Sequence, residues 1–204
     1  MKSIDPTTLS TRDNYKFLTA SIIPRPVAFV TTLSKEGILN GAPFSYFNIV
    51  SSDPPMLSIS VQRSNGKLKD TSRNALDQKE FVVHISDESY VEQINRTAKS
   101  LPHDESEVED AGLTPINSTK ITVPGVKEAN IRFECVLEQI ISLGDPNAES
   151  PSCDLLIGRI VHYHIKDELY ENGRIDPMGL NPVSRLAGSY YAKLGELFEL
   201  KRPT

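Results

Sequence analysis

Apolar and β-branched residues gather in short runs separated by polar turns, which is the pattern of antiparallel strands. Residues 27–33 are almost continuously apolar and predict a buried strand, and residues 44–50 predict a strand that returns antiparallel to it. Residues 56–61 alternate apolar and small polar side chains, as a half-buried strand does. Further strands are predicted at residues 80–85, 130–143 and 155–165.

Two short helices are predicted between these strands. The first runs from Asp70 to Asp77, with Asp70 as its capping residue. The second occupies residues 88–99, where apolar side chains recur at helical spacing after Ser86 or Asp87 as the N-cap.

Strands dominate this pattern, helices are few, and the predicted connections are short. A closed or partly closed antiparallel β-barrel is the economical way to bury the apolar faces of such strands. The 204 residues contain no internal repeat, low-complexity linker or shift in composition. We therefore expect one mainly β domain over residues 1–204, with a few helices.

Composition indicates which partners and which cellular compartment to expect for the protein. The net charge of −5 and the scattered basic residues argue against a nucleic-acid-binding face. No apolar run approaches the roughly 18 residues that span a bilayer, and residues 1–5 lack the apolar core of a signal peptide. Cys135 and Cys153 show no CxxC spacing and are expected to be reduced packing residues on strands. These features predict a cytoplasmic protein with neither membrane nor nucleic-acid partners.

One predicted strand combines small, polar and aromatic side chains. Alternation of side chains along a strand puts Phe44, Tyr46 and Asn48 on one face. Ser45 and Phe47 then face the other side. An aromatic ring beside an amide suits stacking on a flat ligand together with a hydrogen bond to its edge, but the same residues suit cross-strand packing in a core. Both interpretations remain open from the residues alone.

A second candidate lies at the start of the first predicted helix. A helix N-terminus favours a phosphate, Lys69 adds a positive charge, and Thr71 adds a hydroxyl donor. Asn74 lies one turn further and can reach back. Asp70 would repel an anion, so we assign it to capping rather than to ligand binding. A purely structural helix start is the alternative.

Other kinds of site find little support in the sequence. No GxGxxG or GxxxxGK motif is present, so neither a Rossmann nor a P-loop nucleotide site is indicated, and no GxSxG hydrolase elbow occurs. His162 and His164 share a strand face but have no third ligand nearby, so no metal is predicted. His84 lies inside an apolar strand and is expected to be a core histidine.

Together these motifs resemble the flavin reductase-like family, whose members bind FMN in a split antiparallel β-barrel. The resemblance runs from Pro24-Arg25-Pro26 to the closing R-x-x-G-x-x-Y pattern that begins at Arg185, and Thr71 and Asn74 match the family's T-x-x-N pattern. It implies no catalytic side chain. The cofactor-binding residues that we expect are Asn40, Ser45, Tyr46, Phe47, Asn48, Ser60, Lys69, Thr71 and Asn74.

The resemblance implies an NAD(P)H-dependent flavin reductase that supplies reduced flavin or electrons to a partner, for example a monooxygenase. FMN is the expected flavin, FAD is an alternative, and the nicotinamide nucleotide would bind only transiently. The flavin would carry the difficult chemistry while the protein supplies position and electrostatics. Two alternatives are a non-catalytic flavin-binding electron carrier reduced by another protein and a barrel without activity that acts as a binding module.

We also expect a homodimer. A flat flavin needs both faces covered, whereas the motifs supply only one strand wall and one phosphate helix, and the family that the chain resembles dimerises through its barrels. Arg185, Tyr190 and Tyr191 are candidates for the dimer contact, because arginine and tyrosine are enriched at interfaces. The same residues are equally suited to covering the flavin.

Overall fold

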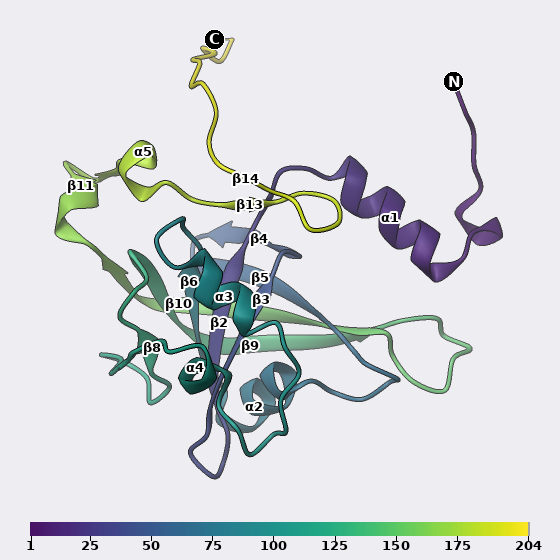
Figure 1. The fold of residues 1–204 in the computed structure, drawn as a ribbon, viewed down its shortest axis with the longest axis horizontal. Helices are drawn as coiled ribbons and strands as arrows, with labels where there is room; N and C mark the ends of the chain where they lie inside the picture. The colour runs from purple at the N-terminus through teal and green to yellow at the C-terminus, as the bar shows by residue number, and fades with distance from the viewer. Residues whose placement is uncertain (204) are drawn as a thin grey trace.

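The body of the protein is a seven-stranded antiparallel sheet (Figure 1), seen in a computed structural model that describes residues 1–203. Five of the strands agree with the sequence predictions within two residues, which confirms a mainly β fold. In spatial order the strands are β3 (Leu39–Phe44), β2 (Ala28–Leu33), β6 (Glu80–Ile85), β9 (Ile131–Leu143), β10 (Cys153–Ile165), β5 (Pro55–Gln62) and β4 (Phe47–Ser52).

The sheet curls into a barrel that is not closed. Its two edge strands, β3 and β4, follow each other in the chain and are joined by Ser45 and Tyr46. Among the residues that the structure describes, no ladder pairs β3 with β4, but the Ser60 amide of β5 donates to the Tyr46 carbonyl at 2.8 Å. The chain therefore crosses the opening between the two edges at this turn.

This crossing corrects the predicted strand at residues 44–50. The strand antiparallel to β2 is β3, which pairs Ala28 with Phe44, whereas β4 pairs with β5 on the other side of the opening. A single strand cannot belong to both ladders, so the backbone turns at Ser45 and Tyr46. The alternation that put Phe44, Tyr46 and Asn48 on one face is consequently interrupted.

Apolar side chains fill both faces of the sheet. Inside the barrel, Phe81 packs so closely on β10 that only a glycine fits at position 158, where the strand also shifts register. The other face is covered by side chains from the segments that contain residues 90–94, 108–113 and 123–129. Cys135 is buried in the inner core, Cys153 begins β10, and both are free thiols.

His84 is a neutral histidine of the core, as predicted. Its Nδ1 lies 2.9 Å from the Phe29 carbonyl, and its Nε2 accepts from the Val126 amide at 2.9 Å. Because Nε2 accepts, Nδ1 carries the proton and donates. Burial lowers the pKa of His84 to about 3, so the ring stays uncharged at physiological pH.

Short helices cover the ends of the barrel, and two of their predicted caps are wrong. The first predicted helix is α2 (Asp70–Gln78), but Lys69 occupies its N-cap position and Asp70 pairs with Arg73 one turn further. The second predicted helix is shorter than expected, because Asp87 accepts from Ser89 in a turn instead of capping. This helix is α3 (Val91–Arg96), which begins after Tyr90.

Two further short helices are α4 (Glu107–Asp110) and α5 (Pro177–Leu180), and there are 3-10 turns η1 (Pro6–Thr8) and η2 (Asp167–Leu169).

An N-terminal helix, α1 (Thr11–Ser21), was not predicted. It is capped by Ser10 but buries only Thr19 along its length, so it lacks the apolar stripe that would reveal it in the sequence. A small sheet then brings the C-terminal segment beside it (Figure 1). Its strands are β1 (Arg25–Pro26), β13 (Ser184–Arg185) and β14 (Tyr191–Ala192).

Two further hairpins complete the described fold, namely β7 (Pro115–Ile116) with β8 (Gly125–Val126), and β11 (Tyr170–Glu171) with β12 (Arg174–Ile175). Over residues 1–203, no helix has both the length and the apolar character needed to cross a membrane.

Candidate functional site

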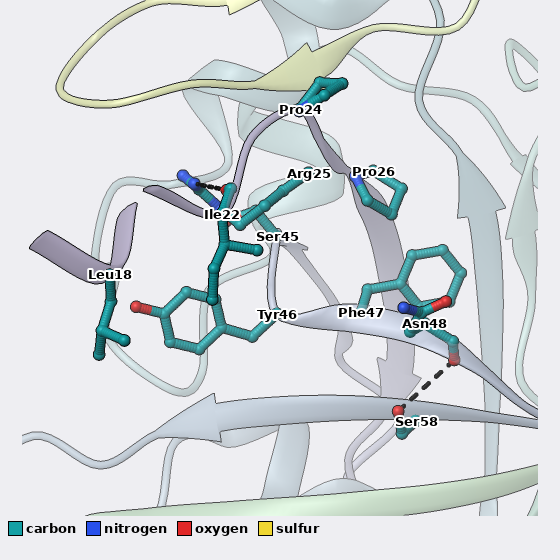
Figure 2. A pocket seen from close by; sticks show the side chains of 10 residues that line it. All are labelled: Leu18, Ile22, Pro24, Arg25, Pro26, Ser45, Tyr46, Phe47, Asn48 and Ser58. Atoms are coloured by element: carbon teal, nitrogen blue, oxygen red, sulfur yellow. Dashed lines mark hydrogen bonds between the residues drawn. The ribbon is translucent and has the colours of Figure 1, made fainter. Parts of the chain in front are cut away.

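An apolar cleft of about 410 Å³ lies beside the turn that joins β3 to β4 (Figure 2). Leu18 of α1 and Ile22, which caps the end of α1, form one side of it, and Tyr46 lies close to both in the view of Figure 2. The opposite side and floor come from residues 24–26, from the turn at Ser45, and from the strands β4 and β5. These other lining residues are Pro24, Arg25, Pro26, Ser45, Phe47, Asn48 and Ser58.

Arg25 joins the parts of the chain that form this cleft. Its Nη1 donates to the carbonyls of Thr19 and Ile22, each at 2.7 Å, which fixes the end of α1. Its Nη2 donates to the Leu186 carbonyl at 3.0 Å, and its Nε lies 3.4 Å from the Ser45 hydroxyl. Three segments distant in sequence are therefore held around the guanidinium group of Arg25, a residue that is only 6% exposed.

The sequence analysis missed this role of Arg25, which it named only as part of the family's Pro24-Arg25-Pro26 pattern. Most partners of the side chain are backbone carbonyls, which leave no residue pattern. The available signal was an arginine between two prolines at the start of a buried strand, because an arginine in such a place has to find acceptors.

A polar cleft of about 330 Å³ adjoins the apolar one. Lys69 at the start of α2 and Lys99 after α3 bring two positive charges to its wall. Glu107, the first residue of α4, is a buried acid in the same wall. The other lining residues are Asn40, Ala42, Pro43, Phe44, Ser64, Leu68, Asp70, Thr71, Thr97, Ala98, Ser100 and Leu101.

Buried polar side chains behind the polar cleft form one hydrogen-bond network. The amide oxygen of Asn40 accepts from the hydroxyls of Thr71 and Thr32, both at 3.2 Å. Asn74 in turn donates to Thr32 at 3.2 Å, and the amide nitrogen of Asn40 donates to Glu107 at 2.8 Å. Asn40, Thr71 and Asn74 are thus brought together, but they are bonded to one another inside the protein. Of the predicted phosphate group, Lys69 is the exposed member.

The predicted cofactor-binding residues divide between the two clefts. The apolar cleft contains Ser45, Tyr46, Phe47 and Asn48, and the polar cleft contains Asn40, Lys69 and Thr71. Asn74 and Ser60 line neither cleft. Asn74 donates to Thr32, and the Ser60 hydroxyl accepts from Gln62.

The two linings meet at consecutive residues, with Phe44 in the polar cleft and Ser45 in the apolar one. Adjacent Cα atoms are only about 3.8 Å apart, so the two linings come close together along the backbone at this point.

Burial affects one titrating side chain in each cleft. In the apolar cleft, burial and the nearby Tyr15 raise the pKa of Tyr46, and the charge of Arg25 acts in the opposite direction. In the polar cleft, burial raises the pKa of Glu107, and Asp70 adds to this effect. The hydrogen bonds that Glu107 accepts from Gly41 and Asn40 oppose the shift in part.

Within residues 1–203, no group of three or more histidine, cysteine, aspartate or glutamate residues has the arrangement of a metal site. The His162 and His164 rings lie side by side, with centroids 4.7 Å apart, and His164 contacts the carboxylate of Glu134 at 2.6 Å. That carboxylate also accepts from the amides of Thr119 and Lys120, so Glu134 holds the loop around these two residues against β9.

A family model described as "Flavin reductase like domain" matches residues 20–181, well over half of the chain. The chain belongs to the flavin reductase-like family. This match confirms the resemblance drawn from the sequence motifs and identifies the open barrel as the split barrel of these flavoprotein oxidoreductases.

Solved structures agree with this assignment. Nitrilotriacetate monooxygenase component B from Bacillus cereus is 66% identical, covers 98% of each chain and superposes with a TM-score of 0.96. The 2-nitrobenzoate 2-nitroreductase NbaA of Pseudomonas fluorescens is 32% identical, with a TM-score of 0.88 over 100% of this chain and 97% of that one. Flavoredoxin of Desulfovibrio vulgaris shares the fold, with 21% identity, 88% and 91% coverage and a TM-score of 0.74.

The residues present fit the cofactor of this family. The apolar cleft offers an aromatic residue, aliphatic side chains and backbone polar groups, which suits a flat ring system with hydrogen-bonding edges. The polar cleft offers two lysines and the start of a helix, which suits a phosphate. Their junction at Phe44 and Ser45 allows one molecule to contact both.

The raised pKa of Glu107 predicts a pH-dependent stability that Glu107→Gln removes. Because the folded-state pKa of Glu107 lies above the usual glutamate value of 4.5, the folded protein binds this proton more tightly than the unfolded chain does. This contribution to stability is present at low pH and is lost as the pH rises through the folded-state pKa. The free energy of unfolding in urea should therefore differ between Glu107→Gln and wild type in favour of the variant by more at pH 7 than at pH 4. A difference that stays constant with pH would contradict the assignment.

Proposed function

We propose that this protein is an NAD(P)H-dependent flavin reductase that uses FMN and supplies reduced flavin or electrons to a partner protein. The observation that carries the proposal is the junction of an apolar cleft with a lysine-containing polar cleft at Phe44 and Ser45. When bound, the flavin supplies the ability to accept a hydride and pass on its electrons.

In this proposal, the protein binds and orients the two reactants. Tyr46, Phe47 and the aliphatic side chains of α1 cover the ring system and exclude water from it. Backbone groups of residues 45–48 give the ring edge its hydrogen-bond partners, and Lys69 provides a charge-assisted bond to the phosphate. Asn40 and Thr71 hold the wall of the polar cleft in shape through their mutual hydrogen bond.

The nicotinamide donor and the acceptor are the finer parts of the proposal. Since the chain has no dinucleotide fingerprint, the donor would bind transiently over the open side of the apolar cleft. A monooxygenase as partner is supported by the name of the 66%-identical protein, which is the component B of such an enzyme. A nitroaromatic acceptor is supported by the name of the 32%-identical nitroreductase.

The direct test is oxidation of NADH and of NADPH by the purified protein with FMN, FAD or no flavin added. We expect flavin-dependent oxidation, with a preference for one nicotinamide, and electron transfer to 2-nitrobenzoate as a second readout. If the protein binds flavin but oxidises neither nucleotide, it is an electron carrier reduced by another protein. If it binds no flavin, the proposal is wrong.

Lys69→Ala should weaken the binding of FMN far more than that of riboflavin, which has no phosphate. Loss of one charge-assisted hydrogen bond costs about 1.5–3 kcal/mol, or roughly 10- to 150-fold in affinity. Fluorescence titration with both ligands measures the effect. Lys67→Ala is the matched control, since Lys67 is an exposed lysine of the same loop outside both clefts.

Tyr46→Ala should behave differently from Lys69→Ala in the same titration. Its ring lines the apolar cleft, so its removal should weaken FMN and riboflavin by similar factors. Equal losses for both ligands in Lys69→Ala would contradict the phosphate assignment, and unchanged affinities in Tyr46→Ala would leave that ring a purely structural role.

The protein should form a homodimer. The apolar cleft is open on one side, and apolar side chains on α1 and β4 next to it are exposed, among them Ile22 (60%) and Ile49 (80%). A second copy would cover them, and Arg185, Tyr190 and Tyr191 remain candidates for the contact. Sedimentation at micromolar concentration should give about twice the 22.6 kDa chain mass. A monomer that binds flavin tightly would contradict both the dimer and a shared pocket.

A further inference from the structure

Arg25 contributes a buried positive charge to the apolar cleft, and no acidic side chain neutralises it. Arg25 is only 6% exposed as a residue, and every hydrogen-bond acceptor that its guanidinium contacts is neutral. These acceptors are the carbonyls of Thr19, Ile22 and Leu186 and the hydroxyl of Ser45. Across the described residues, no carboxylate lies within ion-pair distance of this side chain.

Arg63 shows the usual arrangement in the same protein. Its side chain is also largely buried, and it pairs with the fully buried Asp154 at 2.7 Å. Buried charges are normally paired in this way, because hydrogen bonds to carbonyls satisfy the N–H groups but leave the net charge in place. Arg25 therefore keeps a full positive charge beside a cleft with apolar walls.

The charge of Arg25 acts across the cleft. Burial and Tyr15 raise the pKa of the Tyr46 hydroxyl, and the charge of Arg25 opposes this rise. Tyr46 and Arg25 belong to different segments and both line the apolar cleft (Figure 2), so a ring bound in the cleft would experience the same field. In a site screened from water such a field is much stronger than at the surface.

We propose that Arg25 stabilises the reduced form of the flavin, by placing a fixed, unpaired positive charge beside the ring system in the apolar cleft. The inference rests on the proposed function. Hydride transfer breaks a C–H bond of the nicotinamide and forms an N–H bond on the flavin. It delivers two electrons and one proton, so the reduced ring gains a net charge of −1 while the nicotinamide gains +1.

The consequence is a difference in affinity between the two states of the cofactor. A positive charge that exists before reduction stabilises the anionic product more than the neutral starting form. Reduced flavin should thus bind more tightly than oxidised flavin, and the reduction potential of the bound flavin should lie above that of free flavin. A purely structural Arg25 would leave the ratio of the two affinities unchanged.

The experiment compares dissociation constants of oxidised FMN and of anaerobically reduced FMN for wild type, Arg25→Gln and Arg25→Lys. In Arg25→Gln the preference for the reduced form should fall at least tenfold, which lowers the two-electron potential by about 29.6 mV. Arg25→Lys keeps the charge and should keep most of the preference.

The matched control is Arg12→Gln, which removes the same charge from an exposed position of α1 outside the cleft. Solvent and salt screen that position, so the preference should not change. A folded Arg25→Gln protein, verified by circular dichroism, that binds both states with the wild-type ratio would overturn the inference.

A measurement on the wild-type protein keeps the inference testable if Arg25→Gln does not fold. A permanent positive charge keeps the reduced ring anionic, so reduction takes up one proton for two electrons. The potential of the bound flavin should then fall by about 29.6 mV per pH unit from pH 5 to pH 8. A slope of about 59 mV per pH unit in the acidic half would mean a neutral reduced ring and would also overturn it. Absence of flavin binding, by contrast, would refute the proposed function itself.

Discussion

The chain has to cross from one edge of the sheet to the other between β3 and β4, and the rest of the site depends on that crossing. Neither ladder extends through Ser45 and Tyr46, because β3 pairs only with β2 and β4 pairs only with β5. Backbone polar groups freed in this way need other partners. The Tyr46 carbonyl finds one in the Ser60 amide, and the side-chain hydroxyl of Ser45 accepts from Arg25. A gap in the ladder thereby becomes a cleft with ordered walls.

Arg25 then links this gap to both ends of the chain. Because its guanidinium donates to Thr19 and Ile22 on one side and to Leu186 on the other, α1 and the segment of β13 are held in place by a single side chain. Neither segment adds much to the main core, since α1 buries only Thr19. A fixed fork of donors is well suited to this task, because it reaches several acceptors at once.

Much of the fold could be predicted from the sequence, because apolar periodicity records which face of a strand is buried. The strands at residues 56–61 and 80–85 and the core role of His84 are examples. The break at Ser45 and Tyr46 could not, since the strand pattern on either side continues without a polar interruption. The caps at Asp70 and Asp87 failed because an aspartate can accept from several partners. Asp70 pairs with Arg73 of the same helix, and Asp87 accepts from Ser89 and from Asn130.

Seven of the nine predicted cofactor-binding residues line the two clefts, but their division between the clefts was not predicted. Helical spacing put Thr71 and Asn74 near Lys69, the family resemblance added Asn40, and the structure brings Asn40, Thr71 and Asn74 together. What spacing could not give is that the first three bond to each other through Thr32, which leaves Lys69 as the exposed member. Tens of residues along the chain separate Asn40 from Thr71 and Thr32 from Asn74, so local spacing cannot reveal these hydrogen bonds.

The two clefts also differ in how burial acts on charge. In the apolar cleft, the permanent charge of Arg25 remains despite burial, because a guanidinium keeps its proton. In the polar cleft, burial raises the pKa of Glu107 and so favours its neutral form, which diminishes negative charge beside Lys69 and Lys99. Positive charge therefore remains in both clefts for two different reasons, and positive charge is what a flavin phosphate and a reduced flavin ring each require.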